Sequence, residues 1–134
     1  MNHQKSNKKL NRNTSRRKAL FRSLLLSLFL HEEIKTTLTK AKLVKRMADS
    51  LISKAKGGTL SIRRQIFSFL PNKKVVNKLI NEIAPKFTEN KGGFTKLVRI
   101  KNRRGDNTIM AKVELLKKTQ SDKAKVEKDK KAGQ

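Results

Sequence analysis

No acidic side chain precedes Glu32 in this chain, and this feature restricts the possible fold more than any other. Seven lysines and arginines precede Ala19, whereas Leu10 is the only leucine in that stretch. A segment of this kind repels itself and has almost nothing to bury. We therefore expect residues 1–13 to form an extended basic arm that becomes ordered only against an anionic partner.

The charge of the whole chain indicates the same kind of partner. Its 134 residues carry a formal net charge of +25, and the stretch from Lys117 onward holds only seven basic and three acidic residues. Most of the excess charge therefore lies in the body of the chain. Soluble surfaces normally mix both signs, so we expect a polyanion as partner. The length predicts a single domain, residues 14–116, followed by a disordered Lys-rich tail, residues 117–134.

Apolar residues recur at helical spacing in four segments. The first is the most apolar: Thr14 or Ser15 is expected to cap it, and Phe21, Leu25 and Phe29 lie on one stripe. The other three helices are expected within residues 39–57, 59–71 and 72–85. In these, Thr39 is expected to cap the second helix, and Pro85 is expected to end the last.

Two parts of the sequence alternate with the period of a strand. "EEIKTTL", residues 32–38, predicts one short strand, and "FTKLVRIK" and "IMAKVELL" predict a hairpin over residues 94–116. Gly105 and Asp106 are expected to shape the tip of this hairpin, by a positive φ and an Asx bond respectively. The order predicts an α+β fold in which a small three-stranded sheet, one early strand plus the C-terminal hairpin, packs with about four helices.

Nothing in the sequence favours catalysis. His3 and His31 are the only histidines, and no Ser–His–Asp arrangement can be built from them. With ten acidic residues in the whole chain and no cysteine, neither a carboxylate metal cluster nor a thiolate site is expected. The glycine pairs lack the spacing of a phosphate-binding loop. We therefore expect no enzyme activity, no small-molecule substrate, no metal and no cofactor.

Membrane association is not expected either. No apolar run approaches the ~20 residues that a bilayer requires. The run Leu24–Leu30 is followed by no cleavage pattern, so a secretory signal is not expected, and it reads better as a core helix than as part of a mitochondrial transit peptide. A cationic, membrane-disrupting protein would need exposed apolar helix faces, and the stripes here are needed for the core.

Nucleic acid is therefore the expected polyanion. Tyr and Trp are absent and Phe is scarce, which favours contacts with the phosphate backbone over base stacking. A DNA-compacting protein is the alternative, although no coiled-coil heptad or recognition-helix pair supports it. Charge alone nominates basic residues on separate elements: Arg16, Arg17, Lys18, Arg22, Arg63, Arg64, Lys101, Arg103 and Arg104.

Three blocks in this order resemble the bacterial-type family of large-subunit ribosomal protein seventeen. They are "HQKSNKKLNRNTSRRKALFRSL", "LFLHEEIKTTLTKAKLVK" and "KGGFTKLVRIKNRRGDNTIMAKVELL". The resemblance covers residues 3–116. It implies an α+β protein that is a structural constituent of the large ribosomal subunit and binds large-subunit ribosomal RNA beside neighbouring ribosomal proteins, on the solvent side near the peptide exit region. The implied location is the ribosome in a bacterial cytoplasm, with an organellar ribosome as the alternative.

The resemblance also implies RNA-contacting positions. In the first block these are His3, Lys5, Lys8, Lys9, Arg12, Arg16, Arg17 and Lys18. In the second block they are Thr36, Thr37, Lys40 and Lys42. Arg103 and Arg104 of the hairpin are further candidates.

Overall fold

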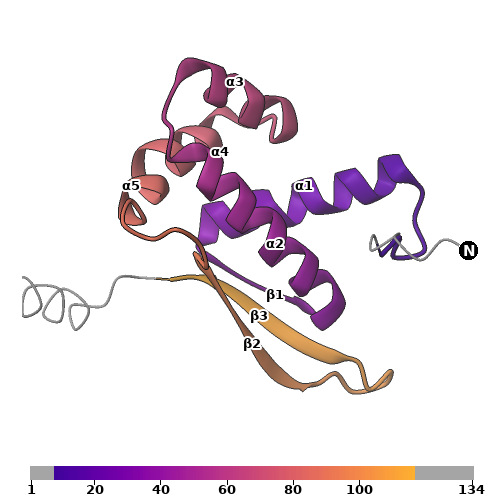
Figure 1. Cartoon of the computed structure of the whole chain (residues 1–134). Coiled ribbons are helices and arrows are strands. Elements are labelled where there is room, and N and C mark those ends of the chain that lie inside the picture. The colour runs from indigo at the N-terminus through magenta and orange to yellow at the C-terminus, as the bar shows by residue number, and fades with distance from the viewer. Residues whose placement is uncertain (1–7, 117–134) are drawn as a thin grey trace, which may run out of the picture.

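The computed structural model describes residues 8–116. Helices cover one face of a three-stranded antiparallel sheet, and no helix or strand of these described residues covers the other face (Figure 1). The α+β class, the position of the early strand in the same sheet as the late hairpin, and the helical layer on one face are therefore confirmed. The remaining parts of the expected arm and tail, residues 1–7 with His3 and Lys5, and residues 117–134, lie outside the described residues.

The first helix, α1, spans Thr14–His31. The expected stripe is confirmed, because Phe21, Leu25, Leu28 and Phe29 are all buried. The expected cap is wrong by one residue: the side chain of Asn13 accepts the hydrogen bond from the Arg16 amide at 3.0 Å. Asn is as good a cap as Ser or Thr, so any of the three adjacent polar residues could cap this helix. The cap is the residue whose side-chain oxygen reaches an unpaired backbone amide, and here that residue is Asn13.

The sheet has the strand order β1–β3–β2, with β1 at Glu33–Thr37, β2 at Thr95–Asn102 and β3 at Ile109–Leu115. Both pairings are antiparallel, so the early strand lies against the second strand of the hairpin. Alternate residues face the helices, as the sequence predicts. On β3 these are Ala111, Val113 and Leu115, all buried.

Helix α2, Leu38–Ala55, packs across the inner face of the sheet (Figure 1). Its Ala41, Val44 and Ala48 are fully buried. The expected cap, Thr39, is wrong: the helix starts two residues earlier than that cap would require, and Thr37 occupies the cap position without a side-chain hydrogen bond. Thr37 is still paired with Met110 in the sheet, so the chain passes from strand to helix with no room for a separate capping residue.

Helix α3, Leu60–Phe69, begins as expected after Thr59, whose hydroxyl accepts from the Ile62 amide. The last helical segment begins after Asn72 and is continuous through α4, Lys73–Lys78, a wide π-helical turn, Leu79–Ile83 (η1), and α5, Ala84–Lys86. Pro85 therefore does not end this segment. Proline cannot donate to the carbonyl four residues earlier, and the preceding π turn, in which the Ala84 amide bonds Leu79, accommodates it.

The described part of the N-terminal arm, residues 8–13, makes a turn against the domain. The Arg12 amide bonds the Lys9 carbonyl at 3.1 Å, and Leu10 has a positive φ of 53°. Leu10 is half-buried and packs against the core. The single leucine of the arm therefore anchors its last residues, which the sequence predicted to be extended.

Candidate nucleic-acid interface

The first turn of α1 gathers the largest group of expected contacts. Arg12, Arg16 and Lys18 are exposed there, and no acidic residue lies in the turn. The Arg17 guanidinium donates to the Arg12 carbonyl at 3.1 Å, which ties the turn of residues 8–13 to the helix. Cations oppose the dipole at this end of a helix, and this arrangement is stabilised when a phosphate docks against both the side chains and the free amides.

The hairpin tip adds a second cationic group, in which one arginine is already paired. Gly105 has a φ of 99°, and Asp106 accepts from the Thr108 amide, so the expected turn is confirmed. Asp106 also receives two hydrogen bonds from Arg103, at 3.2 and 2.5 Å. These bonds lower the pKa of the Asp106 carboxyl far below its ordinary value and raise the pKa of Arg103. The charge of Arg103 is therefore largely neutralised.

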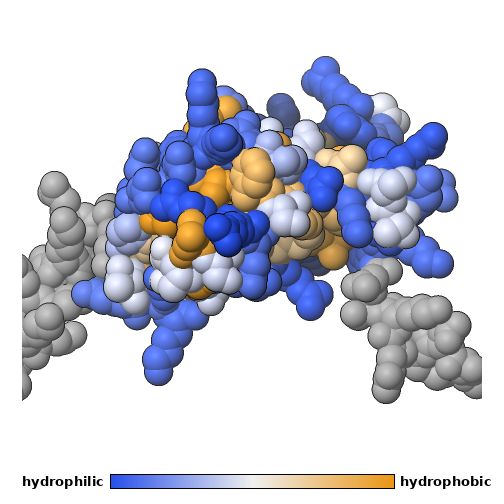
Figure 2. All heavy atoms as spheres, turned by 90° about the horizontal axis from the view of Figure 1, so that it is seen from above, coloured by the Kyte–Doolittle hydropathy of each residue, from blue (hydrophilic) through white to orange (hydrophobic). Residues whose placement is uncertain are grey.

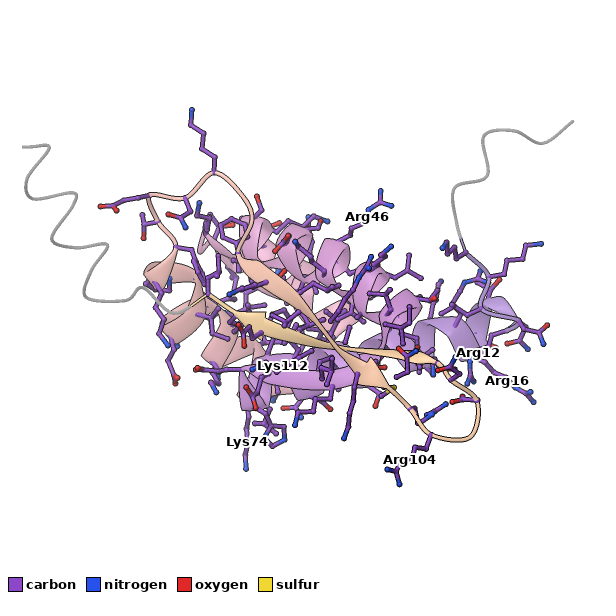
Figure 3. The ribbon with its side chains drawn as sticks, turned by 90° about the horizontal axis from the view of Figure 1, so that it is seen from below. Arg12, Arg16, Arg46, Lys74, Arg104 and Lys112 are labelled. Carbon is purple, nitrogen blue, oxygen red and sulfur yellow. The ribbon has the colours of Figure 1, made fainter. Side chains whose placement is uncertain are left out.

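The unpaired cations of the tip lie at the same end of the molecule as the start of α1. Arg104 extends from the hairpin tip, and Arg12 and Arg16 lie on the same side of the molecule in Figure 3, whereas Figure 1 shows the start of α1 in the helical layer and the tip in the sheet layer. Lys101 is exposed on β2 nearby in the chain. We call this surface, made of Arg12, Arg16, Lys18, Lys101 and Arg104, the basic end.

The expected contacts of the second block divide between core and surface. Thr36 is only 9% exposed and pairs with Ala111, so its side chain belongs to the inner face of the sheet. Thr37 ends β1, Lys40 is half-buried in the first turn of α2, and Lys42 is exposed. Of the four expected contacts in this block, the two lysines, Lys40 and Lys42, therefore reach the surface.

The remaining expected residues lie on the helical layer. The Arg63 guanidinium donates to Asn77 at 2.7 Å and to Asn81 at 3.5 Å, so it joins α3 to α4 and η1, whereas Arg64 is exposed. The Arg22 guanidinium lies over the ring of Phe69, 5.8 Å from its centroid. Such cation–π contacts are favourable and fix the geometry of both groups. Arg22 and Arg63 therefore also have structural contacts.

Acidic residues gather at the end of the molecule where α1 finishes and β3 ends. Glu32 pairs with Lys86 at 3.6 Å, and Lys112 lies between Glu114 at 2.7 Å and Glu33 at 3.3 Å. The bonds to Glu114 and Glu33 raise the pKa of Lys112. The two ends of the molecule therefore differ in charge pairing. At the end around Glu32 and Lys112, acidic and basic side chains pair with one another, whereas the basic end carries cations that a polyanion can neutralise.

Other kinds of site find little support in the described part of the chain. Within residues 8–116, no three histidine, cysteine, aspartate or glutamate side chains come close enough to hold a metal ion. None of the helices in that range has the length and apolar character needed to cross a bilayer. What the geometry offers is an array of hydrogen-bond-donating cations, which suits the oxygens of phosphate groups.

Comparison with known proteins identifies the family. The family model of ribosomal protein L17 matches residues 20–116, which is most of the chain. This chain belongs to the ribosomal protein L17 family. It is 45% identical, over 87% of its length and 97% of the relative's, to the large ribosomal subunit protein bL17 of Desulforapulum autotrophicum. It is 43% identical to the bL17 protein of Fusobacterium nucleatum subsp. nucleatum, over 87% of its own length and the whole of that protein.

In this member of the L17 family, the sequence prediction overlooked cations on α2. Arg46 and Lys54 are exposed on one face of that helix, which also carries Leu43 and Met47. A signal was present, since residues 43, 46, 47, 50 and 54 recur at helical spacing outside the buried stripe. Two half-buried apolar residues flanked by cations at that spacing indicate a face that is neither core nor ordinary solvent-exposed surface.

Proposed function

We propose that this L17-family chain is a structural constituent of the large ribosomal subunit and that it binds large-subunit ribosomal RNA through its basic end. Family membership supports the ribosomal role, which is structural and not enzymatic. The bL17 relatives are bacterial proteins, so the proposed location is the ribosome in a bacterial cytoplasm.

One observation carries the RNA-binding part of the proposal: charge is segregated along the molecule. The start of α1 and the hairpin tip place Arg12, Arg16 and Arg104 at one end (Figure 3), and the acid of the tip, Asp106, pairs with Arg103. The acids Glu32 and Glu33 lie at the other end, in salt bridges with lysines. Surface cations that face no acid of their own chain gain most from phosphate.

The resemblance of the first block extends this proposal to the arm. His3, Lys5, Lys8 and Lys9 would continue the basic end along the RNA, and Lys40, Lys42 and Arg64 would contribute from the helical layer. Neighbouring ribosomal proteins are the other proposed partners. The end that balances its own charges, around Glu32 and Lys112, suits contact with protein or solvent better than contact with phosphate.

The test compares two nucleic acids over a range of salt concentrations. We expect the full chain to bind purified large-subunit ribosomal RNA more tightly than duplex DNA of equal length. If six to ten phosphates are neutralised, the affinity falls by about a thousand- to a hundred-thousandfold between roughly 50 and 200 mM salt on the B-DNA scale. Equal affinity for both nucleic acids would favour the DNA-compacting alternative, and absence from large subunits isolated from the source cell would contradict the ribosomal role.

A further inference from the structure

A groove of about 600 Å³ opens among α1, α2, α3 and the turn of residues 8–13. Its volume falls within the range of about 300–1,000 Å³ that is typical of small-ligand sites. Six apolar side chains form its floor and walls: Phe21, Leu43, Met47, Leu51, Ile66 and Phe69. Figure 2 shows apolar side chains that reach the surface between strongly hydrophilic ones on this helical side of the molecule.

Four cations surround this apolar floor. They come from the N-terminal turn, α1 and both ends of the α2 face: Lys8, Arg17, Arg46 and Lys54. The other two lining residues, Ser50 and Gln65, are uncharged, so no acidic side chain within residues 8–116 lines the groove. An occupant that matches this charge pattern has an apolar, flat body and negative charge at its edge.

Two of the six phenylalanines of the chain, Phe21 and Phe69, line this groove. Phe69 is half-buried at the end of α3, and the Arg22 guanidinium lies 5.8 Å from its ring centroid. The buried Nε of Arg22 has no hydrogen-bond partner among the described residues, so the ring is the contact that the structure gives this guanidinium. The cation–π contact holds Phe69 in place as a groove wall.

We propose that this groove receives one unstacked base of the ribosomal RNA, whose flanking phosphates are bound by Arg46, Lys54 and Arg17. Bases stack on aromatic and apolar side chains because every base has a π face, and the cations of the rim suit the phosphates on either side. An apolar side chain of a protein would match the floor but not four cations. The inference rests on the proposed function, and it adds base contact to a chain whose composition favoured phosphate contacts alone.

The first experiment separates stacking from charge. The full chain and its Phe69→Leu variant are titrated with purified large-subunit ribosomal RNA at several salt concentrations. Loss of one stacked base weakens binding by about five- to a hundred-and-fiftyfold, with an unchanged salt slope, because leucine removes no charge. The matched control is Phe67→Leu on the same helix: Phe67 is 40% exposed and lies outside the groove. We expect its affinity to remain that of the original chain.

A second pair of variants does not depend on the packing of Phe69. Ser50 is exposed at the groove, and Ser68 is exposed on α3 outside it. Ser50→Glu places a carboxylate among the rim cations and should weaken binding several-fold more than Ser68→Glu, which makes the same change in net charge. Thermal unfolding of all four variants shows that each is folded.

Chemical probing of the RNA identifies the occupant. With the original chain and with Phe67→Leu, one base that reacts with dimethyl sulfate in free RNA should become protected, and Phe69→Leu should restore its reactivity. If the original chain binds the RNA but Phe69→Leu and Ser50→Glu match their controls, the groove holds no base and the inference is wrong, while the proposed function stands. Phe69→Leu and Ser50→Glu could instead bind purified RNA normally and be lost only from particles that contain other ribosomal proteins. In that case a protein segment fills the groove, which also overturns the inference. Failure of the original chain to bind the RNA at all would overturn the proposed function itself.

Discussion

The hydroxyl of Thr95 donates a 2.8 Å hydrogen bond to the carboxylate of Asp49 and so joins the first residue of β2 to the middle of α2. Thr95 is only 2% exposed and lies in an otherwise apolar contact between helix and sheet. Buried polar groups in native proteins are nearly always paired, and here the pair fixes the register of helix against strand at one point.

Thr95→Val removes the donor while keeping the shape of the side chain. The carboxylate of Asp49 then loses its partner from the sheet, and we expect a loss of about 1–3 kcal/mol in the free energy of unfolding, measured by urea titration. Thr39→Val, at an exposed position of α2, should stay within about 0.5 kcal/mol. Equal stability of the two variants would mean that the hydrogen bond contributes nothing net.

Leu25 tests the position of the central helix. It is fully buried, whereas Leu30 on the same helix is 52% exposed. We expect Leu25→Ala to lower the free energy of unfolding by about 2–5 kcal/mol through lost burial and a residual cavity, and Leu30→Ala to lower it by less than about 1 kcal/mol. The two variants make the same chemical change, so the difference between their urea midpoints reports burial alone.

Much of the fold could be predicted because it depends on the spacing of apolar residues and on capping and turn residues that act locally. The stripe through Phe21 and Leu25, the helix start at Thr59 and the turn at Gly105 are each determined within a few residues. Exact helix ends were less predictable, since Asn13 competes with its polar neighbours for the cap. Pro85 was misread because the π turn that accommodates it depends on packing of Leu79, Ile80 and Ile83 in the core.

The positive charge of the candidate site could be predicted from the sequence, but its individual contacts could not. Unmixed positive charge is visible in the sequence, and it nominated Arg16 and Arg104. The sequence could not show that Asp106 neutralises Arg103, because that contact depends on the turn geometry. It also could not show the groove, since Phe21 and Phe69 lie 48 positions apart and line it together only when three helices pack.

The basic end should dominate the salt dependence of RNA binding. Replacing Arg16 and Arg104 together with alanine removes two proposed phosphate contacts, so the slope of log affinity against log salt should become shallower by about 1.4–1.8. Lys91→Ala is the control for each lost charge, because Lys91 is exposed in the loop after α5, near Glu89. A slope change per charge as large for Lys91 as for the two arginines would show that net charge, and not the basic end, determines binding.

Asp106→Asn should strengthen RNA binding. The asparagine keeps the oxygen that accepts from the Thr108 amide at 3.3 Å, so the turn persists, but it removes the charge that pairs with Arg103. The released guanidinium can bind one more phosphate, and the salt slope should steepen by about 0.7–0.9. Weaker or unchanged binding would show that Arg103 faces no phosphate.

The dependence of this effect on pH follows from the direction of the pKa shift. The pKa of Asp106 in the folded chain is lowered, chiefly by the hydrogen bonds from Arg103. The pair is therefore intact above the ordinary pKa of an aspartate, about 3.9, and is lost only as the pH falls through the lower folded value. The ratio of the two affinities, variant to original chain, should therefore stay constant between about pH 5 and 8 in filter-binding titrations. A ratio that shrinks toward pH 5 would show that Asp106 already takes up a proton there and that its pairing with Arg103 is weaker than the geometry indicates.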